Sequence, residues 1–262
     1  LKGQIFMKNE LEKALKTVPE LYHDTLQPSA QETGKMLARI PRAINAAFSG
    51  LDKWILNREY SVDETKKLLT EKLNKVDPDK IVEPEPYVAI PAIQAISYAM
   101  NSDELRNLYA NLLAKSMISD TKDTVHPSFV EIIKQMSPID ARIFQLIMNA
   151  GSRPLINLIV KREHSGSYPI QYHCSWIQDF SIKQCATSLD SLLRLGLIEI
   201  PFDEYYTDEK IYNHVKQNPL FKKLEQSHKN SLPPGETLDY EKSYIKLPDL
   251  SLLFYEVCVL NP

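Results

Sequence analysis

Prolines divide this chain more clearly than any other residue type. The segment 77–91, DPDKIVEPEPYVAIP, contains four of the 17 prolines. A proline pushes the residue before it out of the helical region, and inside a helix it removes a hydrogen bond. The segment is therefore predicted to be an extended connector. Its apolar residues predict that it packs along neighbouring helices, and these residues are Ile81, Val82, Tyr87, Val88 and Ile90.

An amphipathic segment precedes the connector. Across residues 36–51, apolar side chains recur at steps of three and four, a spacing typical of a helix with one buried face. Pro41 lies inside this stripe and predicts a kink or a break. Ser61 and Glu64 have the spacing of a capping box, which predicts that a second helix begins at Ser61.

Further helices are predicted after the connector. The region 91–118 carries an apolar stripe, and Asn101 with Glu104 has capping-box spacing at its centre. Another helix is then predicted to begin at Pro127, because proline is tolerated at the first position of a helix. Residues 29–136 are therefore predicted to form a helical domain that contains the proline-rich connector.

The local signals change at residue 137. Helix starts are predicted at Ser137, which precedes a proline, and at Ser181, which has capping-box spacing with a glutamine. The β-branched run 154–160, PLINLIV, is typical of a strand. Strands are also predicted at 197–200, LIEI, and at 254–260, FYEVCVL. This order of helices and strands is that of a winged helix.

The predicted fold is mainly α, with an N-terminal helical region followed by a winged-helix-like α+β module that has a small sheet. The module occupies residues 137–262. About 50 residues separate its two wing strands, more than a tight hairpin needs, so residues 201–250 are predicted to be an insertion. Residues 1–28 are predicted to be an N-terminal arm or helix. Residues 1–6 precede Met7 and are interpreted as an addition to the natural chain.

The charge of the second module argues against DNA binding. Residues 138–262 contain 13 Lys and Arg against 15 Asp and Glu, and helix 181–195 offers only Lys183 and Arg194. Affinity for DNA depends on clustered basic side chains. The sequence therefore favours a protein-interaction module, with a winged-helix DNA-binding regulator as the alternative. A basic patch formed on folding would reverse this preference, and its members would be Arg153, Lys161, Arg162 and His164.

The cysteines and the absence of a signal peptide predict a cytoplasmic protein. The three cysteines are widely spaced and form no CxxC pair, which fits a reducing compartment. The most membrane-like stretch, residues 36–56, contains four charged residues and is too charged for a spanning helix. An amphipathic segment over residues 29–58 that acts on a membrane surface remains an alternative.

No motif identifies a catalytic site, a cofactor or a metal. The chain has only 7 glycines, and it contains no GxGxxG, GxxxxGK[ST], GxSxG or HExxH sequence. His164, His173 and Cys174 lie close together, but their spacing matches no standard zinc motif. The protein is therefore predicted to have no catalytic residues, no cofactor and no metal. An enzyme with an unrecognised active site remains open.

Several runs of residues together resemble one family. They are KIVEPEPYVAIPAIQAI (80–96), DELRNLYANLLAKSM (103–117), VHPSFVEIIKQMSPIDARIFQLI (125–147) and SLDSLLRLGLIEI (188–200). In this order they resemble the abortive infection alpha family over about residues 20–200. The resemblance implies a bacterial cytoplasmic protein of phage defence, in which an infected cell stops growing or dies before phage are released. It supplies no catalytic residues.

Five residues are candidates for an interaction site. Asn111 and Glu131 are polar residues in the matched helices. They are predicted to lie either at a contact between helices or subunits, or simply in solvent. Exposure to solvent is the favoured interpretation. His126 precedes a helix-opening proline, where a local cap is favoured over general-base chemistry. Tyr205 and Tyr206 lie in the insertion, and tyrosine is enriched in interface cores, although ordinary surface packing explains them equally well.

The predicted function is that of an anti-phage, abortive infection protein that acts as a sensor or an effector through protein contacts. The predicted partner is a host protein, a phage protein or a second copy of the chain. Two alternatives involve other partners. One is a DNA-binding regulator built on the winged-helix-like module, and the other is a membrane-active effector that uses residues 29–58.

Overall fold

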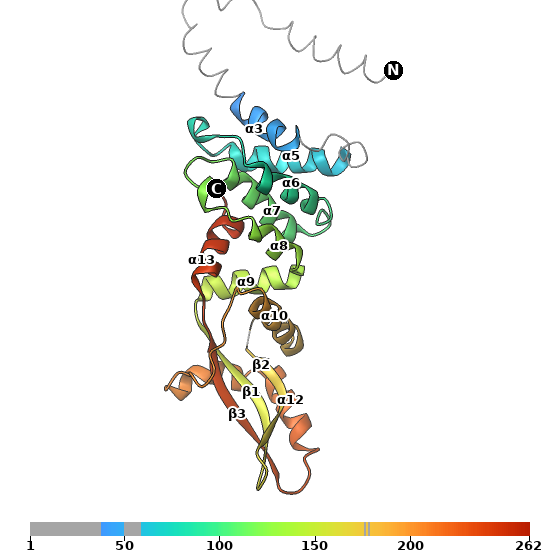
Figure 1. Ribbon diagram of the computed structural model, residues 1–262. Helices are drawn as coiled ribbons and strands as arrows, with labels where there is room; N and C mark the ends of the chain where they lie inside the picture. Colours follow the sequence, from blue (N-terminus) through green and yellow to red (C-terminus); the bar gives the residue numbers. More distant parts are fainter. Residues whose placement is uncertain (1–37, 50–58, 176, 178) are drawn as a thin grey trace, which may run out of the picture.

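A computed structural model describes the following parts of the chain: residues 38–49, 59–175, 177 and 179–262. Within them the protein is mainly α-helical and has one small antiparallel sheet, as predicted. Figure 1 shows an elongated molecule with α3 to α9 towards one end and the sheet towards the other. The predicted arm, residues 1–28, and much of the amphipathic segment 29–58 lie outside the described residues.

The helical end contains a set of short and medium helices packed around a common core. They are α3 (Arg39–Phe48), α5 (Glu59–Leu73), α6 (Pro86–Ile96), α7 (Asp103–Ser116), α8 (Ser128–Lys134) and α9 (Pro138–Ala150). The apolar stripe of α3 is buried in this core, at Ile40, Ala43, Ile44, Ala47 and Phe48. Pro41 lies in the first turn of α3, where the N–H that it lacks would have no partner in the helix.

The connector at 77–91 is shorter than predicted, because α6 begins at Pro86 and contains Pro91. Pro86 occupies the first turn, where proline is tolerated. Pro91 costs a helix interior about 3 kcal/mol. One face of α6 is buried at Val88, Ala89, Ala92, Ile93 and Ile96. Burial of this face offsets the cost of Pro91, and tertiary packing therefore extends the helix through a residue that local rules would exclude.

The remaining part of the connector contains one short turn of 3-10 helix. After this turn it is extended and packed, as predicted. Ile81 forms an isolated antiparallel bridge with Ile118. On either side of it, the Val82 N–H donates to the Met117 carbonyl at 2.9 Å, and the Ser119 N–H donates to the Lys80 carbonyl at 2.8 Å. The backbone that follows η2 (Pro78–Lys80) is thus held against the end of α7.

Two helix starts differ from their predicted positions by one or two residues. The helix expected from Ser61 begins at Glu59. The cap of α7 is Ser102 rather than Asn101, and its hydroxyl accepts a hydrogen bond from the Leu105 N–H at 3.3 Å. Both residues at the start of α7 are good caps, so the spacing alone does not separate them.

The second half of the chain combines helices with three strands. Its elements are β1 (Arg153–Arg162), β2 (Ser167–Cys174), α10 (Ile182–Arg194), η4 (Glu209–Tyr212), α11 (Asn213–Lys216), α12 (Pro219–Lys229), β3 (Glu236–Ile245), α13 (Asp249–Phe254) and a π-helical turn, η5 (Tyr255–Val259). The helix starts predicted at Ser137 and Ser181 are both confirmed as complete capping boxes. Asp140 of the first box also accepts a hydrogen bond from the Ser191 hydroxyl at 3.2 Å, which joins α9 to α10.

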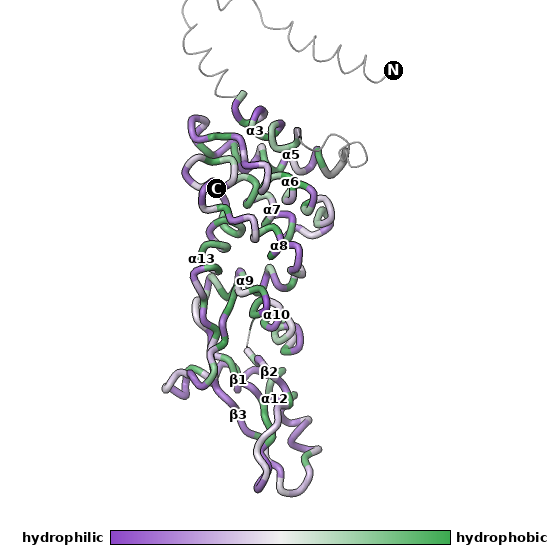
Figure 2. The backbone as a smooth tube through the Cα atoms, viewed as in Figure 1, coloured by the Kyte–Doolittle hydropathy of each residue, from purple (hydrophilic) through white to green (hydrophobic). Residues whose placement is uncertain are grey.

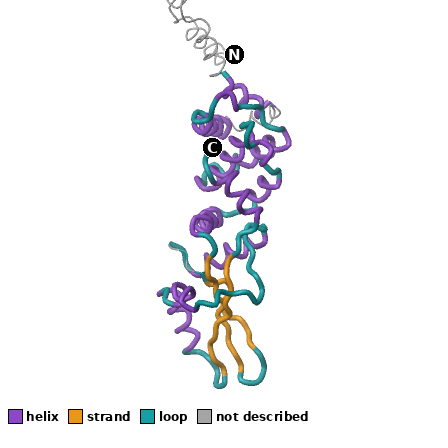
Figure 3. The backbone as a smooth tube through the Cα atoms, turned by 90° about the vertical axis from the view of Figure 1, so that its left-hand side faces the viewer, coloured by secondary structure: helices purple, strands orange, loops and turns teal. Residues whose placement is uncertain are grey.

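The sheet has the order β2-β1-β3, and both pairings are antiparallel. The strand predicted at 154–160 is confirmed as β1, whereas β2 and β3 were not predicted and β3 lies inside the predicted insertion. Figure 2 shows β1 as the more hydrophobic strand and β3 as the more hydrophilic one. Figure 3 shows helices beside one face of the sheet. The cluster on this face consists of Ile156, Leu158, Cys174, Tyr212, Val215 and Phe221.

The two strands expected to form the wing are not formed as predicted. Residues 197–200 contribute a single bridge, between Glu199 and Lys246. Residues 254–260 were predicted as a strand, and this is wrong, because they belong to the end of α13 and to η5. Phe254 packs edge-on against Phe129 and Phe144, with ring centroids 5.3 Å and 5.5 Å away. The segment therefore packs against helices and is not a strand of the sheet.

Candidate interaction site

The insertion presents aromatic side chains on a loop that is held by the sheet. This aromatic loop consists of residues 201–206, PFDEYY, between the Glu199 bridge and η4. The side chain of Phe202 is 90% exposed and that of Tyr205 is 56% exposed. Two large aromatic groups are thus available to a partner on one short segment.

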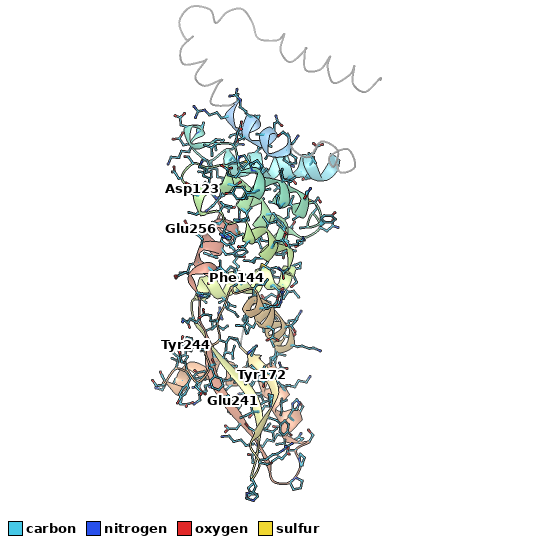
Figure 4. The ribbon with its side chains drawn as sticks, in the orientation of Figure 1. Asp123, Phe144, Tyr172, Glu241, Tyr244 and Glu256 are labelled. Carbon is cyan, nitrogen blue, oxygen red and sulfur yellow. The ribbon has the colours of Figure 1, made fainter. Side chains whose placement is uncertain are left out.

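Hydrogen bonds from β3 reach one backbone atom and one side chain of the aromatic loop. The Ser243 hydroxyl donates to the Pro201 carbonyl at 3.0 Å, and the Tyr244 hydroxyl donates to the Glu204 carboxylate at 2.8 Å. Both donors belong to β3. Figure 4 shows Tyr244 of β3 and Tyr172 of β2 at opposite edges of the sheet, in agreement with the strand order.

Tyr206 anchors the loop, whereas Tyr205 is exposed. The Tyr206 ring lies 5.0 Å from that of Tyr244 and 6.4 Å from that of Tyr212. Its hydroxyl is hydrogen bonded to that of Ser152, at the start of β1. Its backbone N–H donates to the Tyr212 hydroxyl at 2.9 Å. The two adjacent candidates therefore occupy different environments, one packed on the sheet and one in solvent.

The exposed part of the aromatic loop is acidic. Asp203 and Glu204 are both exposed, and Asp203 has a φ of 59°, in the left-handed region that Asp tolerates better than most residues. The Lys242 ammonium lies 5.9 Å from the centre of the Tyr205 ring and is paired with Glu209. The loop therefore carries aromatic groups flanked by negative charge.

Asn111 is buried and makes its contacts inside the chain. The favoured prediction, that its side chain lies in solvent, is therefore wrong. Its amide nitrogen donates to the carbonyls of Cys258, at 2.9 Å, and Val259, at 3.0 Å. Lys115, one turn later in α7, donates to the Glu256 carbonyl at 2.7 Å. These bonds satisfy carbonyls at the end of the chain and join α7 to η5.

His126 makes the local cap that its position predicted. Its Nδ1 atom accepts a hydrogen bond from the Ser128 N–H at 3.2 Å and lies 2.6 Å from the Ser128 hydroxyl. The ring also lies beside Phe129, with 6.0 Å between the centroids. The histidine thus satisfies one of the first N–H groups of α8.

Glu131 lies on the wall of a cleft between α6, α7 and α8. The cleft has a volume of about 630 Å³, and Leu105, Val130 and Ile133 supply much of its apolar surface. Glu131 is exposed and pairs with Lys134 at 3.6 Å. Burial, together with the Glu131 charge, raises the pKa of the Tyr109 hydroxyl above its ordinary value. A tyrosine in this state is a poor proton donor.

Two members of the basic patch that would have favoured DNA binding are paired with acidic side chains. Lys161 pairs with Asp239, and Arg162 pairs with Glu236 at 3.1 Å. On α10, the guanidinium of Arg194 donates to the Gln135 side chain at 2.7 Å. These charges are compensated or engaged locally, which leaves little of the clustered charge that phosphate backbones require.

His173 and Cys174, which are adjacent in the sequence, have different surroundings. His173 contacts a carboxylate, and Cys174 lies in the core. The Nδ1 atom of His173 lies 2.6 Å from the Asp190 carboxylate and so joins β2 to α10. Cys174 is buried, and burial raises the pKa of its thiol to about 12. Among the described residues, no three His, Cys, Asp or Glu side chains are grouped closely enough to hold a metal ion. No helix in the described ranges is both long enough and apolar enough to cross a bilayer.

Three comparisons relate the chain to known proteins. The model of a family described as abortive infection alpha matches residues 57–258. None of the curated proteins compared with the chain matches it. One solved structure, that of an uncharacterized protein from the hydrocarbon-degrading marine bacterium Alcanivorax borkumensis SK2, is 15% identical and has a TM-score of 0.34. The match covers 54% of this chain and 96% of that one, and at this TM-score it does not establish a shared fold.

Proposed function

Because the chain belongs to the abortive infection alpha family, we propose that it acts in the bacterial cytoplasm, in defence against phage, by binding another protein through its aromatic loop. The observation that supports this proposal is the exposure of Phe202, at 90%, on a loop that the sheet anchors. A pocket on a partner that covers this ring would recover the free energy of removing its apolar surface from water.

The geometry of the loop suits a protein contact for an energetic reason. Aromatic side chains supply much of the binding energy of interfaces when they enter a pocket on the partner. The bonds at the Pro201 carbonyl and the Tyr206 N–H already order the loop backbone, so binding costs less conformational entropy than it would for a free loop. Phe202 and Tyr205 are the anchors, and Tyr206 is a positioning residue.

The charge beside the aromatic groups defines the partner. Asp203 and Glu204 flank Phe202 and Tyr205, so the matching surface is an apolar pocket with lysine or arginine at its rim. Such a partner is a host or phage protein, and its binding produces or reports the arrest of the infected cell. Duplex DNA repels an acidic loop, and a membrane surface with anionic lipids does the same.

The test is protection of bacteria against phage by the full chain and by two variants. Phe202→Ala combined with Tyr205→Ala removes the anchors. Tyr98→Ala is the matched control, because Tyr98 is 74% exposed in the turn that follows α6, at the other end of the molecule. We expect the double variant to lose protection while its circular dichroism and thermal unfolding stay unchanged, and the control to retain protection.

A second measurement identifies the contact. A photocrosslinking amino acid at position 202, introduced into the full chain, is activated during infection, and the same group at position 98 is the control. One adduct specific to position 202, lost in Asp203→Lys, supports the proposal. Full protection by the double variant overturns it. Adducts with DNA or lipid, or with a second copy of the chain, overturn the choice of partner.

A further inference from the structure

A second cleft lies where the helical end meets the sheet, and the proposed partner contact does not use it. Its volume is about 620 Å³, within the range of small-molecule sites. It is bordered by the end of α9, the start of β1 and the segment from η4 to α11. Pro154, Ile211 and Val215 supply its apolar surface.

The ionisable side chains that line this cleft are all basic. Arg153, Lys210 and His214 line it, and no Asp or Glu is among the described residues of its lining. This is unusual in a chain whose formal net charge is −3. Lys210 and His214 are four residues apart, at the spacing that places side chains on one side of a helical turn. Arg153 approaches from β1.

The two carboxylates that precede Lys210 in the sequence make contacts of their own. Asp208 accepts a hydrogen bond from the backbone N–H of Lys210 at 2.9 Å. Glu209 pairs with Lys242, and its other oxygen lies 3.9 Å from the Lys216 ammonium. The acidic residues that precede Lys210 in the sequence therefore do not neutralise the cleft.

The partial burial of Arg153 favours the binding of an anion in the cleft. Arg153 is half-buried, and one of its terminal nitrogens donates to the Leu146 carbonyl at 3.3 Å. Desolvation lowers the pKa of its guanidinium from the ordinary value, which reflects the cost of holding that charge away from water. An anion beside the guanidinium offsets this cost, and arginine binds phosphate oxygens in a bidentate manner.

We infer that this basic cleft binds a small organic phosphate, with Arg153, Lys210 and His214 around the phosphate group and the body of the ligand against Pro154, Ile211 and Val215. A compound of nucleotide size fits the volume and uses both the basic and the apolar surfaces. The ligand would hold η4 and α11 against β1. Since η4 follows the aromatic loop directly, the site is placed to influence that loop.

The test is a titration of the purified full chain at low ionic strength by calorimetry. The probes are inorganic phosphate, pyrophosphate and a nucleoside monophosphate. We expect saturable binding of the nucleoside monophosphate, with at least about tenfold weaker binding of inorganic phosphate, since the latter makes no apolar contacts. Hydrogen exchange of residues 206–216 should slow when the nucleoside monophosphate is bound.

The variant Lys210→Gln with His214→Gln should weaken binding by about tenfold or more, the effect of losing one hydrogen bond to a charged group. Lys222→Gln with Lys223→Gln is the matched control, because both lysines are exposed on α12 and do not line the cleft. Equal weakening in both variants would show attraction by net charge alone and would overturn the site. So would the absence of saturable binding to all three probes at millimolar concentration. These measurements need no phage and no protein partner, so they are independent of the proposal for the aromatic loop.

Discussion

The side-chain amide of Asn111 in α7 donates a hydrogen bond of 2.9 Å to the backbone carbonyl of Cys258, a residue 147 positions later in the chain. The same nitrogen donates to the Val259 carbonyl at 3.0 Å. A π-helical turn at the end of the chain leaves carbonyls without partners in their own helix. One buried amide satisfies two of them, and the last helical segment is thereby held in the middle of the helical core.

Replacing Asn111 with alanine should destabilise the protein. One buried and one partly buried carbonyl lose their donor, and a buried unsatisfied group costs about 1–3 kcal/mol before any rearrangement. We expect the free energy of unfolding, measured by urea denaturation, to fall by about 2 kcal/mol or more. Asn107→Ala, one turn earlier in α7 and exposed, is the control and should change stability by less than about 0.5 kcal/mol. Equal effects of the two substitutions would show that the buried amide contributes little.

Replacing Asp140 with alanine should loosen the contact between α9 and α10. The Asp140 carboxylate accepts from the Ser137 N–H at 2.8 Å and from the Ser191 hydroxyl at 3.2 Å. Loss of a cap costs about 1 kcal/mol, and loss of the second bond costs about as much again. Thermal unfolding should show the decrease. Asp140→Asn keeps an acceptor and should retain most of the stability, so an equally large loss in Asn and Ala would point to the charge instead.

Stability should fall at alkaline pH because of buried thiols. Burial raises the pKa of Cys174 from 9.0 to about 12, and it also raises the pKa of Cys258. The unfolded chain therefore loses the Cys174 proton first, so this contribution is complete below pH 9 and is lost between pH 9 and about 12. Each such thiol lowers the free energy of unfolding by up to about 1.4 kcal/mol for each pH unit in this range.

The measurement is the free energy of unfolding between pH 8 and 10.5, under reducing conditions, for the native chain and for Cys174→Ala. The variant should be less stable at pH 8, because a buried side chain is shortened. Its slope above pH 9 should be smaller, since one titrating group has been removed. Identical slopes in the two proteins would mean that the Cys174 thiol does not titrate differently on unfolding.

The three cysteines should react slowly with a thiol reagent in the folded protein. Cys174, Cys185 and Cys258 are all buried, and burial raises the pKa of each thiol. The reactive species is the thiolate, which is therefore scarce and covered. Labelling with Ellman's reagent at pH 8 should follow local opening in the native state and be complete within seconds in denaturant. Rapid labelling of a thiol without denaturant would show that its segment opens readily.

Local hydrogen bonding made several elements predictable. The capping boxes at Ser137 and Ser181 each use two groups three residues apart, so a short stretch of sequence contains the whole interaction. The cap made by His126 is equally local. β1 was recognised for a similar reason, because its β-branched run is buried on both faces of the sheet and has no competing helical spacing.

The candidate site was only partly visible in the sequence. Tyrosines in the insertion indicated an interaction surface, but nothing in the spacing separated Tyr205, which is exposed, from Tyr206, which packs on Tyr244. Phe202 was missed, because an isolated phenylalanine is usually buried. Its exposure depends on β3, a polar strand whose pairing with β1 involves residues about 80 positions apart.

The sequence by itself determined where several helices begin, the mainly α character and the β1 strand, because caps and apolar periodicity act over a few residues. Only the tertiary structure decided the helix through Pro91, the polar β3 strand and the helical end of the chain. In each case the deciding contacts come from elsewhere: a buried face of α6, the backbone of β1, and the side chains of Asn111 and Lys115. Burial and hydrogen bonding between distant segments outweigh local preferences of a few kcal/mol, and no local pattern records them.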